Sequence, residues 1–146
     1  MEAWKEAGPG ALGFTGATEE AMKEISSERF LAERLASPNV KMLIATAGRD
    51  VLGFASLRSE GKRNVELSGI VVLQSTSGLG IGTRLVRKSL ALAARLGFRT
   101  VTVRTEAFNR RAIGFYRKNG FTESGKTTEK VGRTRVQLQI LQKTLR

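Results

Sequence analysis

Three glycines lie within five positions of the segment SGLGIGTRL, residues 77–85, between an apolar run and a stretch of helical periodicity. Gly78, Gly80 and Gly82 leave the main chain uncovered, so that amide N–H groups can converge on one point at the start of a helix. Unsatisfied amides and the helix dipole favour an anion at such a point, and phosphate is the anion that such sites most often bind. The spacing therefore predicts a phosphate-binding turn.

Two common phosphate-binding loops do not fit this turn. Thr83 stands where the dinucleotide-binding fingerprint has its third glycine, and no acidic residue lies about 20 positions further on. The P-loop string of Gly, four residues and Gly-Lys-Ser/Thr is absent from the sequence. The turn must therefore belong to another kind of phosphate site.

The missing residue types exclude several chemistries. The 146-residue chain has no His and no Cys, and Asp50 is its only aspartate. This composition excludes Ser-His-Asp and Cys-His nucleophile systems, thiol redox chemistry and the usual zinc sites. We expect no metal, and an acid or base drawn from Glu, Tyr, Lys or a chain terminus. We also expect a cytoplasmic protein without a membrane segment, because Cys is absent and the longest apolar run, GIVVL, is far below the roughly 20 residues of a span.

Helices and strands alternate around the turn. Periodicity and capping residues predict helices over residues 19–25, 28–36, 81–96 and 109–120, and strands over residues 41–47, 51–57, 65–73, 100–105 and 135–143. Residues 8–17 are expected to form a Gly-rich loop, and residues 122–135 another loop. This order predicts an α+β fold in one domain, residues 1–146, with a mixed sheet and helices on its faces.

A second motif, NRRAIGFYRKNGF, occupies residues 109–121. Together with the glycine turn it resembles the GNAT superfamily of acyl-CoA-dependent N-acyltransferases. In motif A of that family a strand ending in Val leads to Arg/Gln-x-x-Gly-x-Gly/Ala, which matches here at Val72, Gly80 and Gly82, with Ser77 in place of Arg or Gln. Motif B, Asn-x-x-Ala-x-x-Phe-Tyr-x-x-x-Gly-Phe, matches at Asn109, Ala112, Phe115, Tyr116, Gly120 and Phe121. The resemblance covers about residues 40–145.

The resemblance implies a mostly antiparallel central sheet, but the family's usual first strand is not evident. The chain opens on MEAWKEAG, which looks like the end of the helix that normally follows that strand. Either the true start lies upstream, or the chain has been trimmed, or this member does without the strand. In the last case an exposed sheet edge needs a cover, for which we expect a second subunit in a homodimer.

The resemblance also implies acetyl-CoA as the acyl donor. The turn residues Ser77, Gly78, Leu79, Gly80, Ile81, Gly82 and Thr83 would hold its pyrophosphate. The main chain of Ile70, Val71 and Val72, on a strand that splays from its neighbour, would pair with the pantetheine arm. The N–H group of Val72 would polarise the thioester carbonyl. Asn109 would hold the same arm, and it can cap its helix at the same time.

Two side chains are candidates for proton transfer in this frame. Glu66, four residues before Ile70, would remove a proton from the amine through water; it is equally well an ordinary exposed strand residue, and Glu106 is the reserve. Tyr116, the only tyrosine, would protonate the departing CoA thiolate, whereas its structural alternative is packing against Phe115 and Phe121.

The predicted function is transfer of an acetyl group from acetyl-CoA to a primary amine by direct attack in a ternary complex, because there is no Cys to form an acyl-enzyme. The acceptor is a small molecule, a protein N-terminus or a lysine. A second hypothesis is a CoA-binding or regulatory module. It is favoured if Glu66 points away from the expected site of acetyl transfer and Tyr116 is buried. A third, a basic nucleic-acid-binding domain, is disfavoured by one Trp and one Tyr as the stacking candidates.

Positive charge is concentrated in the second part of the chain. The net charge is +12, and from Arg84 onward sixteen Lys and Arg face three Glu. Arg84, Arg87 and Lys88, which follow the glycine turn, are candidates for the 3′-phosphate of CoA. The remaining excess exceeds what one CoA neutralises, which keeps an acidic acceptor or nucleic acid among the expected partners.

Overall fold

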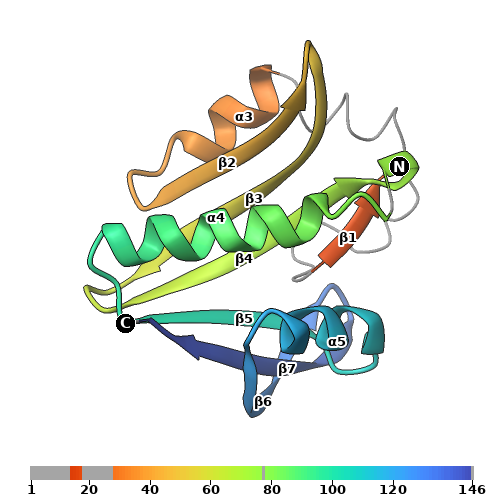
Figure 1. The fold of residues 1–146 in the computed structure, drawn as a ribbon. Coiled ribbons are helices and arrows are strands. Elements are labelled where there is room, and N and C mark those ends of the chain that lie inside the picture. The colour runs from red at the N-terminus through yellow and green to blue at the C-terminus, as the bar shows by residue number, and fades with distance from the viewer. Residues whose placement is uncertain (1–13, 18–27, 77, 146) are drawn as a thin grey trace.

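The computed structural model describes residues 14–17, 28–76 and 78–145 (Figure 1). Within these residues seven strands form one sheet in the order β2-β3-β4-β5-β7-β6, and β1 pairs with β4 outside this path. The elements are β1 (Phe14–Ala17), α3 (Glu28–Leu35), β2 (Val40–Ala47), β3 (Asp50–Glu60), β4 (Asn64–Leu73), the 3₁₀ turn η1 (Gln74–Thr76), α4 (Ile81–Arg95), β5 (Thr100–Glu106), α5 (Arg110–Lys118), β6 (Thr122–Val131) and β7 (Thr134–Thr144).

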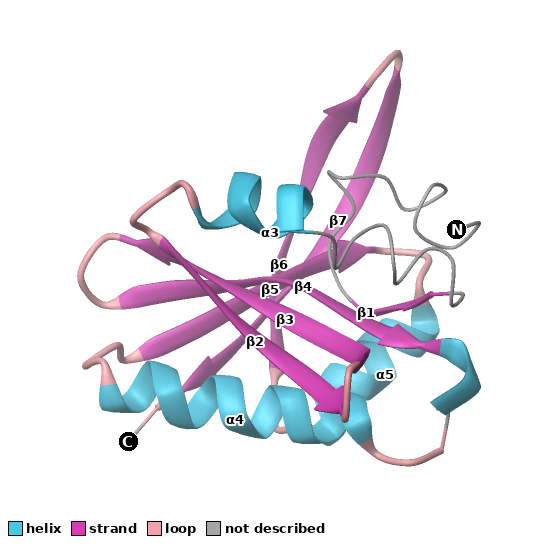
Figure 2. Ribbon diagram, turned by 90° about the horizontal axis from the view of Figure 1, so that it is seen from above, coloured by secondary structure: helices cyan, strands magenta, loops and turns pink. Residues whose placement is uncertain are grey.

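The sheet is mixed and mostly antiparallel, as expected. Strands β2, β3 and β4 are antiparallel neighbours, as are β5, β7 and β6, whereas β4 pairs in parallel with both β5 and β1. Helices α4 and α5 lie on one side of the sheet and α3 on the other (Figure 2). The predicted α+β fold class is therefore confirmed.

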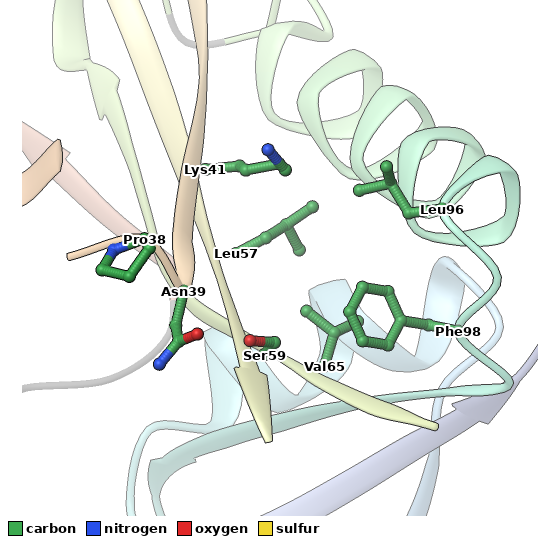
Figure 3. A pocket seen from close by; sticks show the side chains of 8 residues that line it. All are labelled: Pro38, Asn39, Lys41, Leu57, Ser59, Val65, Leu96 and Phe98. Atoms are coloured by element: carbon green, nitrogen blue, oxygen red, sulfur yellow. The ribbon is translucent and has the colours of Figure 1, made fainter. Parts of the chain in front are cut away.

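The hydrophobic core lies between the sheet and the helices α4 and α5. Leu57, Val65 and Val101, from three neighbouring strands, are at most 3% exposed and belong to one cluster with residues of both helices. Leu57 and Val65 point to the face of the sheet that α4 covers. Together with Phe98 they line a cavity of about 250 Å³ at the C-terminal end of α4 (Figure 3). Side chains alternate along a strand, so the residues next to Leu57 and Val65 point to the opposite face of the sheet.

Helices α4 and α5, which belong to the two sequence motifs, form where periodicity and capping residues predict them. Gly97 follows the C-cap of α4 and Gly120 that of α5, and both glycines have φ of 92°, the left-handed conformation that terminates a helix. The predicted helix over residues 81–96 ends one residue earlier, because Leu96 follows α4, and its side chain is 46% exposed. The predicted helix over residues 28–36 is confirmed as α3, and the one over residues 19–25 lies outside the described residues.

Two expected loops are strands in the structure. Residues 14–17, within the expected Gly-rich loop, form β1, and residues 122–131, within the other expected loop, form β6. Because β1 pairs with β4, the outer edge of β2 has no partner strand among the described residues. Whether the family's first strand is missing stays a prediction, because most of the chain before α3 lies outside the described residues.

Candidate active site

The glycine turn connects β4 to α4 and exposes main-chain N–H groups. Gly80 is the residue before the helix, with φ of 76° and no side-chain cap, and the first turn of α4 contains no acidic residue. The first hydrogen bond within the helix runs from the N–H of Arg84 to the carbonyl of Gly80, at 3.0 Å. The N–H groups of Ile81, Gly82 and Thr83 therefore have no partner within the helix, as the first turn of any helix requires.

The turn needs glycine for its backbone conformation. Gly78 and Gly80 have φ of 86° and 76°, and a Cβ atom added at either would meet nothing within 4 Å. This conformation costs a residue other than glycine roughly 1–2 kcal/mol. The open space beside Gly80 is also compatible with close approach of an anion. Ser77 lies outside the described residues.

Positive charge flanks the start of α4. Arg84 and Lys88 line a cavity of about 500 Å³ between α4 and the edge strand β2, together with apolar residues such as Leu43. Arg87, the third cationic candidate from this helix, is exposed. Neither this cavity nor the one at the other end of α4 is lined by Glu66 or Tyr116.

Strands β4 and β5 diverge, as the family resemblance implies. They pair over only three positions, Asn64–Glu66 with Thr100–Thr102, although β4 continues to Leu73 and β5 to Glu106. Strand β4 also contains a bulge opposite Ser56 and Leu57, where the register with β3 shifts by one residue. We call the opening beyond the last β4–β5 pair the fork.

The edge of β4 within the fork is not free, contrary to the expectation. Strand β1 pairs with it in parallel, so that Phe14, Thr15 and Gly16 lie opposite Ile70, Val71 and Val72. The other edge of β4 pairs with β3, so β1 lies on the side that faces β5. It also contacts α5. The main chain of residues 70–72 is thus paired on both sides.

Tyr116 lies in the core beneath the fork. The side chain is fully buried, with its ring centroid 5.4 Å from that of Phe115 and 5.6 Å from that of Phe121, both edge-on. The hydroxyl group has no hydrogen-bond partner in the described part of the chain. Burial, and to a lesser extent the charge of Glu106, raise the pKa of Tyr116 above its ordinary value. The phenol therefore remains a proton donor at neutral pH.

Asn109 caps helix α5. Its Oδ1 accepts a hydrogen bond from the N–H group of Ala112 at 3.1 Å, which leaves Nδ2 without a partner among the described residues. The predicted cap is confirmed, and the amide retains donors for a ligand. The bond to a pantetheine arm stays a prediction.

Glu66 is buried between two arginines, which corrects the view of an ordinary exposed strand residue. The side chain is 0% exposed; Oε1 accepts a hydrogen bond from Nη2 of Arg58 at 2.6 Å, and Oε2 one from Nε of Arg104 at 2.5 Å. The bond to Glu66 raises the pKa of Arg104, and burial partly opposes it. Neither arginine could be singled out from the sequence alone. Their only signal was the alternation of β3 and β5, which places each on the same face as Glu66 once the register is known.

The fold, the glycine turn and the fork define an acetyltransferase of the GNAT type. The model of the acetyltransferase (GNAT) family matches residues 13–121, about three quarters of the chain. The chain belongs to this family.

Relatives agree with this assignment, and solved structures share the fold. An uncharacterized N-acetyltransferase of Mycobacterium tuberculosis is 37% identical over 108 residues, which cover 74% of this chain and 69% of the relative. Among solved structures, a GNAT family acetyltransferase from Elizabethkingia anophelis with acetyl-CoA bound has a TM-score of 0.67 at 15% identity and covers 82% of this chain and 84% of the other. The smu.2055 protein of Streptococcus mutans has a TM-score of 0.70 at 22% identity, covering 84% and 80%.

Within residues 14–17, 28–76 and 78–145, no three Asp or Glu residues converge in a way that could hold a metal ion. None of the described helices has the length and apolar character to cross a membrane.

Proposed function

We propose that the chain, as one domain, transfers the acetyl group of acetyl-CoA to a primary amine by direct attack in a ternary complex. The observation that carries this proposal is the glycine turn, whose uncovered amides lie at the start of α4 directly after the strand that forks from β5. Isothermal titration calorimetry with CoA and thiol release from acetyl-CoA with a panel of amines test it. The absence of both heat and thiol release would contradict it.

Each side chain of the site has a role in this proposal. The turn from Ser77 to Thr83 binds the pyrophosphate, and Nδ2 of Asn109 binds the pantetheine arm. Tyr116 donates the proton that the CoA thiolate takes up as the C–S bond breaks. Glu66 is the candidate base that acts on the amine through water. Both oxygens of Glu66 are held in ion pairs, which favours Glu106 as the alternative base. Glu106 has no ion pair within the described residues.

The pantetheine arm and β1 compete for one edge in this proposal. In the proposal, the main chain of residues 70–72 pairs with the pantetheine arm. In the structure, β1 occupies this edge of β4, and it also contacts α5, which carries Tyr116. Strand β1 must therefore leave before acetyl-CoA occupies the fork. Its departure opens a path towards the phenol.

Proline within β1 is expected to strengthen CoA binding. Proline has no N–H group to donate to a neighbouring strand. Adjacent residues direct their main-chain groups to opposite sides, so one of Thr15→Pro and Gly16→Pro must remove a donor that faces β4. If β1 is paired nine-tenths of the time, its release strengthens the apparent affinity by about tenfold. Calorimetry with CoA measures this, and unchanged or weaker affinity in both variants would show that β1 does not compete.

Alanine at Gly80 is expected to weaken CoA binding. The Cβ atom would enter the open space of the turn, and φ of 76° strains the backbone, which together lower the affinity by about tenfold. Gly61→Ala is the matched control, because Gly61 has φ of 78°, nothing within 4 Å, and a place in the turn between β3 and β4. Both variants should lose about 1–2 kcal/mol of unfolding free energy, but only Gly80→Ala should bind CoA more weakly. Equal affinities would place the pyrophosphate elsewhere.

A second candidate function is CoA binding without transfer. Two observations favour it: Tyr116 is fully buried, and both oxygens of Glu66 are bonded to guanidinium groups. The amine panel separates the two functions. Calorimetric binding of CoA without thiol release for any amine would support the binding module.

The remaining proposals rest on the sequence and on the edge of β2. We place the enzyme in the cytoplasm, and we expect a homodimer in which a second copy covers the edge of β2 that has no partner strand among the described residues. The basic second part of the chain leaves an acidic acceptor or nucleic acid as a further partner.

A further inference from the structure

Three charged side chains form a row across the sheet at the fork. Arg58 lies directly opposite Glu66 in the register of β3 and β4. Glu66 belongs to the last pair between β4 and β5, and Arg104 lies two residues beyond its partner Thr102, on the same face. All three point away from α4, because their neighbours Leu57, Val65 and Val103 belong to the core on the α4 side. The row therefore lies at the closed end of the fork, where β4 and β5 begin to separate.

The row has one positive charge in excess and unused donors. Glu66 neutralises one of the two guanidinium groups and takes a single N–H from each, Nη2 of Arg58 and Nε of Arg104. A guanidinium has five N–H donors, and the other donors of both arginines have no partner within the described residues. The side chains of Arg58 and Arg104 are 48% and 28% exposed, so they are accessible to a ligand. Planar donors around partly buried positive charge fit a carboxylate.

Two other glutamates act on the row without pairing with it. Glu60 and Glu129 raise the pKa of Arg104 through their charge, and neither forms an ion pair with it. By register, each lies four strand positions along and two strands across from Arg104, and Glu60 is also two positions from Arg58 on the same face of β3. These charges weaken the positive field of the row, and they leave the remaining N–H donors of both arginines without a partner within the described residues.

We propose that Arg58 and Arg104 bind a carboxylate of the acyl acceptor, so that the substrate class is a small amine that also carries a carboxylate, as amino acids do. This inference rests on the proposed acetyl transfer. Glu66 holds the two guanidinium groups in place, and the amine of the acceptor lies towards the fork. The carboxylate then selects the acceptor without taking part in bond making.

The first test uses the full-length chain with paired acceptors. Amino acids with α-, β- and γ-amino groups are compared with their carboxamides in an assay of thiol release from acetyl-CoA. A charge-assisted hydrogen bond is typically worth about 10- to 100-fold, so kcat/KM for the acid should exceed that for the amide by about this factor. The comparison is made at equal concentrations of the unprotonated amine, because the two compounds differ in the pKa of the amine.

The second test uses arginine variants. Arg58→Gln and Arg104→Gln should each lower the ratio of kcat/KM for the acid to kcat/KM for the amide about tenfold. Arg58→Lys should fall between the wild type and Arg58→Gln, because lysine keeps the charge and loses the fork-shaped donors. Arg29→Gln is the control, since Arg29 pairs with Glu33 on the surface of α3 and is 90% exposed. It should retain the preference for the acid.

The outcomes separate this inference from the proposed function. If amides are acetylated as well as acids, or if the preference survives both Arg→Gln changes, the inference is wrong while acetyl transfer stands. If no acid releases thiol but other amines do, the inference is equally wrong. If neither CoA binding nor any thiol release is found, both fail. A preference for the acid that disappears in Arg58→Gln and Arg104→Gln supports the inference.

Discussion

Replacing Tyr116 with Phe is expected to lower kcat about 10²- to 10⁴-fold, the usual effect of removing a general acid. The same change should leave the free energy of unfolding unchanged or raise it by about 1 kcal/mol, because the hydroxyl group is buried without a partner among the described residues. Steady-state kinetics and urea unfolding of the same preparations measure both quantities. Equal turnover of Tyr116→Phe and wild type would exclude the phenol from the reaction.

A neighbouring aromatic residue provides the control for this variant. Phe121→Leu disturbs the same ring cluster without touching the hydroxyl group, so it should lose stability and keep the turnover of the folded fraction. The raised pKa of Tyr116 can be followed directly, because it is the only tyrosine. In the unfolded chain the phenol loses its proton near pH 10, whereas in the folded chain it keeps it. The free energy of unfolding should therefore not depend on the ionisation of Tyr116 below about pH 10, and it should fall as the pH rises beyond that value. No phenolate absorbance should appear until the protein unfolds.

Replacing Glu66 with Gln is expected to lower the free energy of unfolding by about 3 kcal/mol. The change leaves two guanidinium groups beside a fully buried amide, and removing one partner of a buried ion pair usually costs about 3–5 kcal/mol. The lower end applies because Arg58 is half exposed. Glu123→Gln is the matched control, because the pair of Glu123 with Arg117 is on the surface, and it should cost less than about 1 kcal/mol.

The same variant decides whether Glu66 acts as a base. If Glu66 only holds the two arginines, kcat per folded molecule should change by no more than a few-fold for an uncharged acceptor. If it removes the proton from the amine, kcat should fall about 10²- to 10⁴-fold and the acidic limb of the pH profile should change. A loss confined to Glu106→Gln would assign the proton transfer to the reserve residue.

Elements with local signals could be predicted from the sequence. Helix α5 has a side-chain cap at Asn109, a glycine at 120 in the left-handed conformation and an apolar face that includes Tyr116, all within twelve residues. The turn before α4 was equally evident, because glycine at 78 and 80 is required by the backbone itself. Such signals act over one or two turns of chain, so they are readable without the rest of the fold.

Elements that depend on distant partners could not be predicted. Strand β6, TESGKTTEKV, has no alternation of apolar residues, and it is a strand because β7 supplies its hydrogen-bond partners. Strand β1 pairs with residues more than fifty positions away. Arg104 is 38 positions from Glu66, and only the parallel register of β4 and β5 brings them together. In each case the missing information is the register between strands, which local composition does not contain.

If β1 competes with CoA as proposed, its pairing with β4 makes it a tethered competitor for the cofactor. A tethered segment has a constant effective concentration, so the fraction of open molecules does not change as the protein is diluted. If opening precedes binding, the observed association rate should level off at high CoA concentration, at the rate at which β1 leaves. In that case, changes that loosen the four-residue strand β1 would raise both the maximal rate of CoA association and the affinity for CoA.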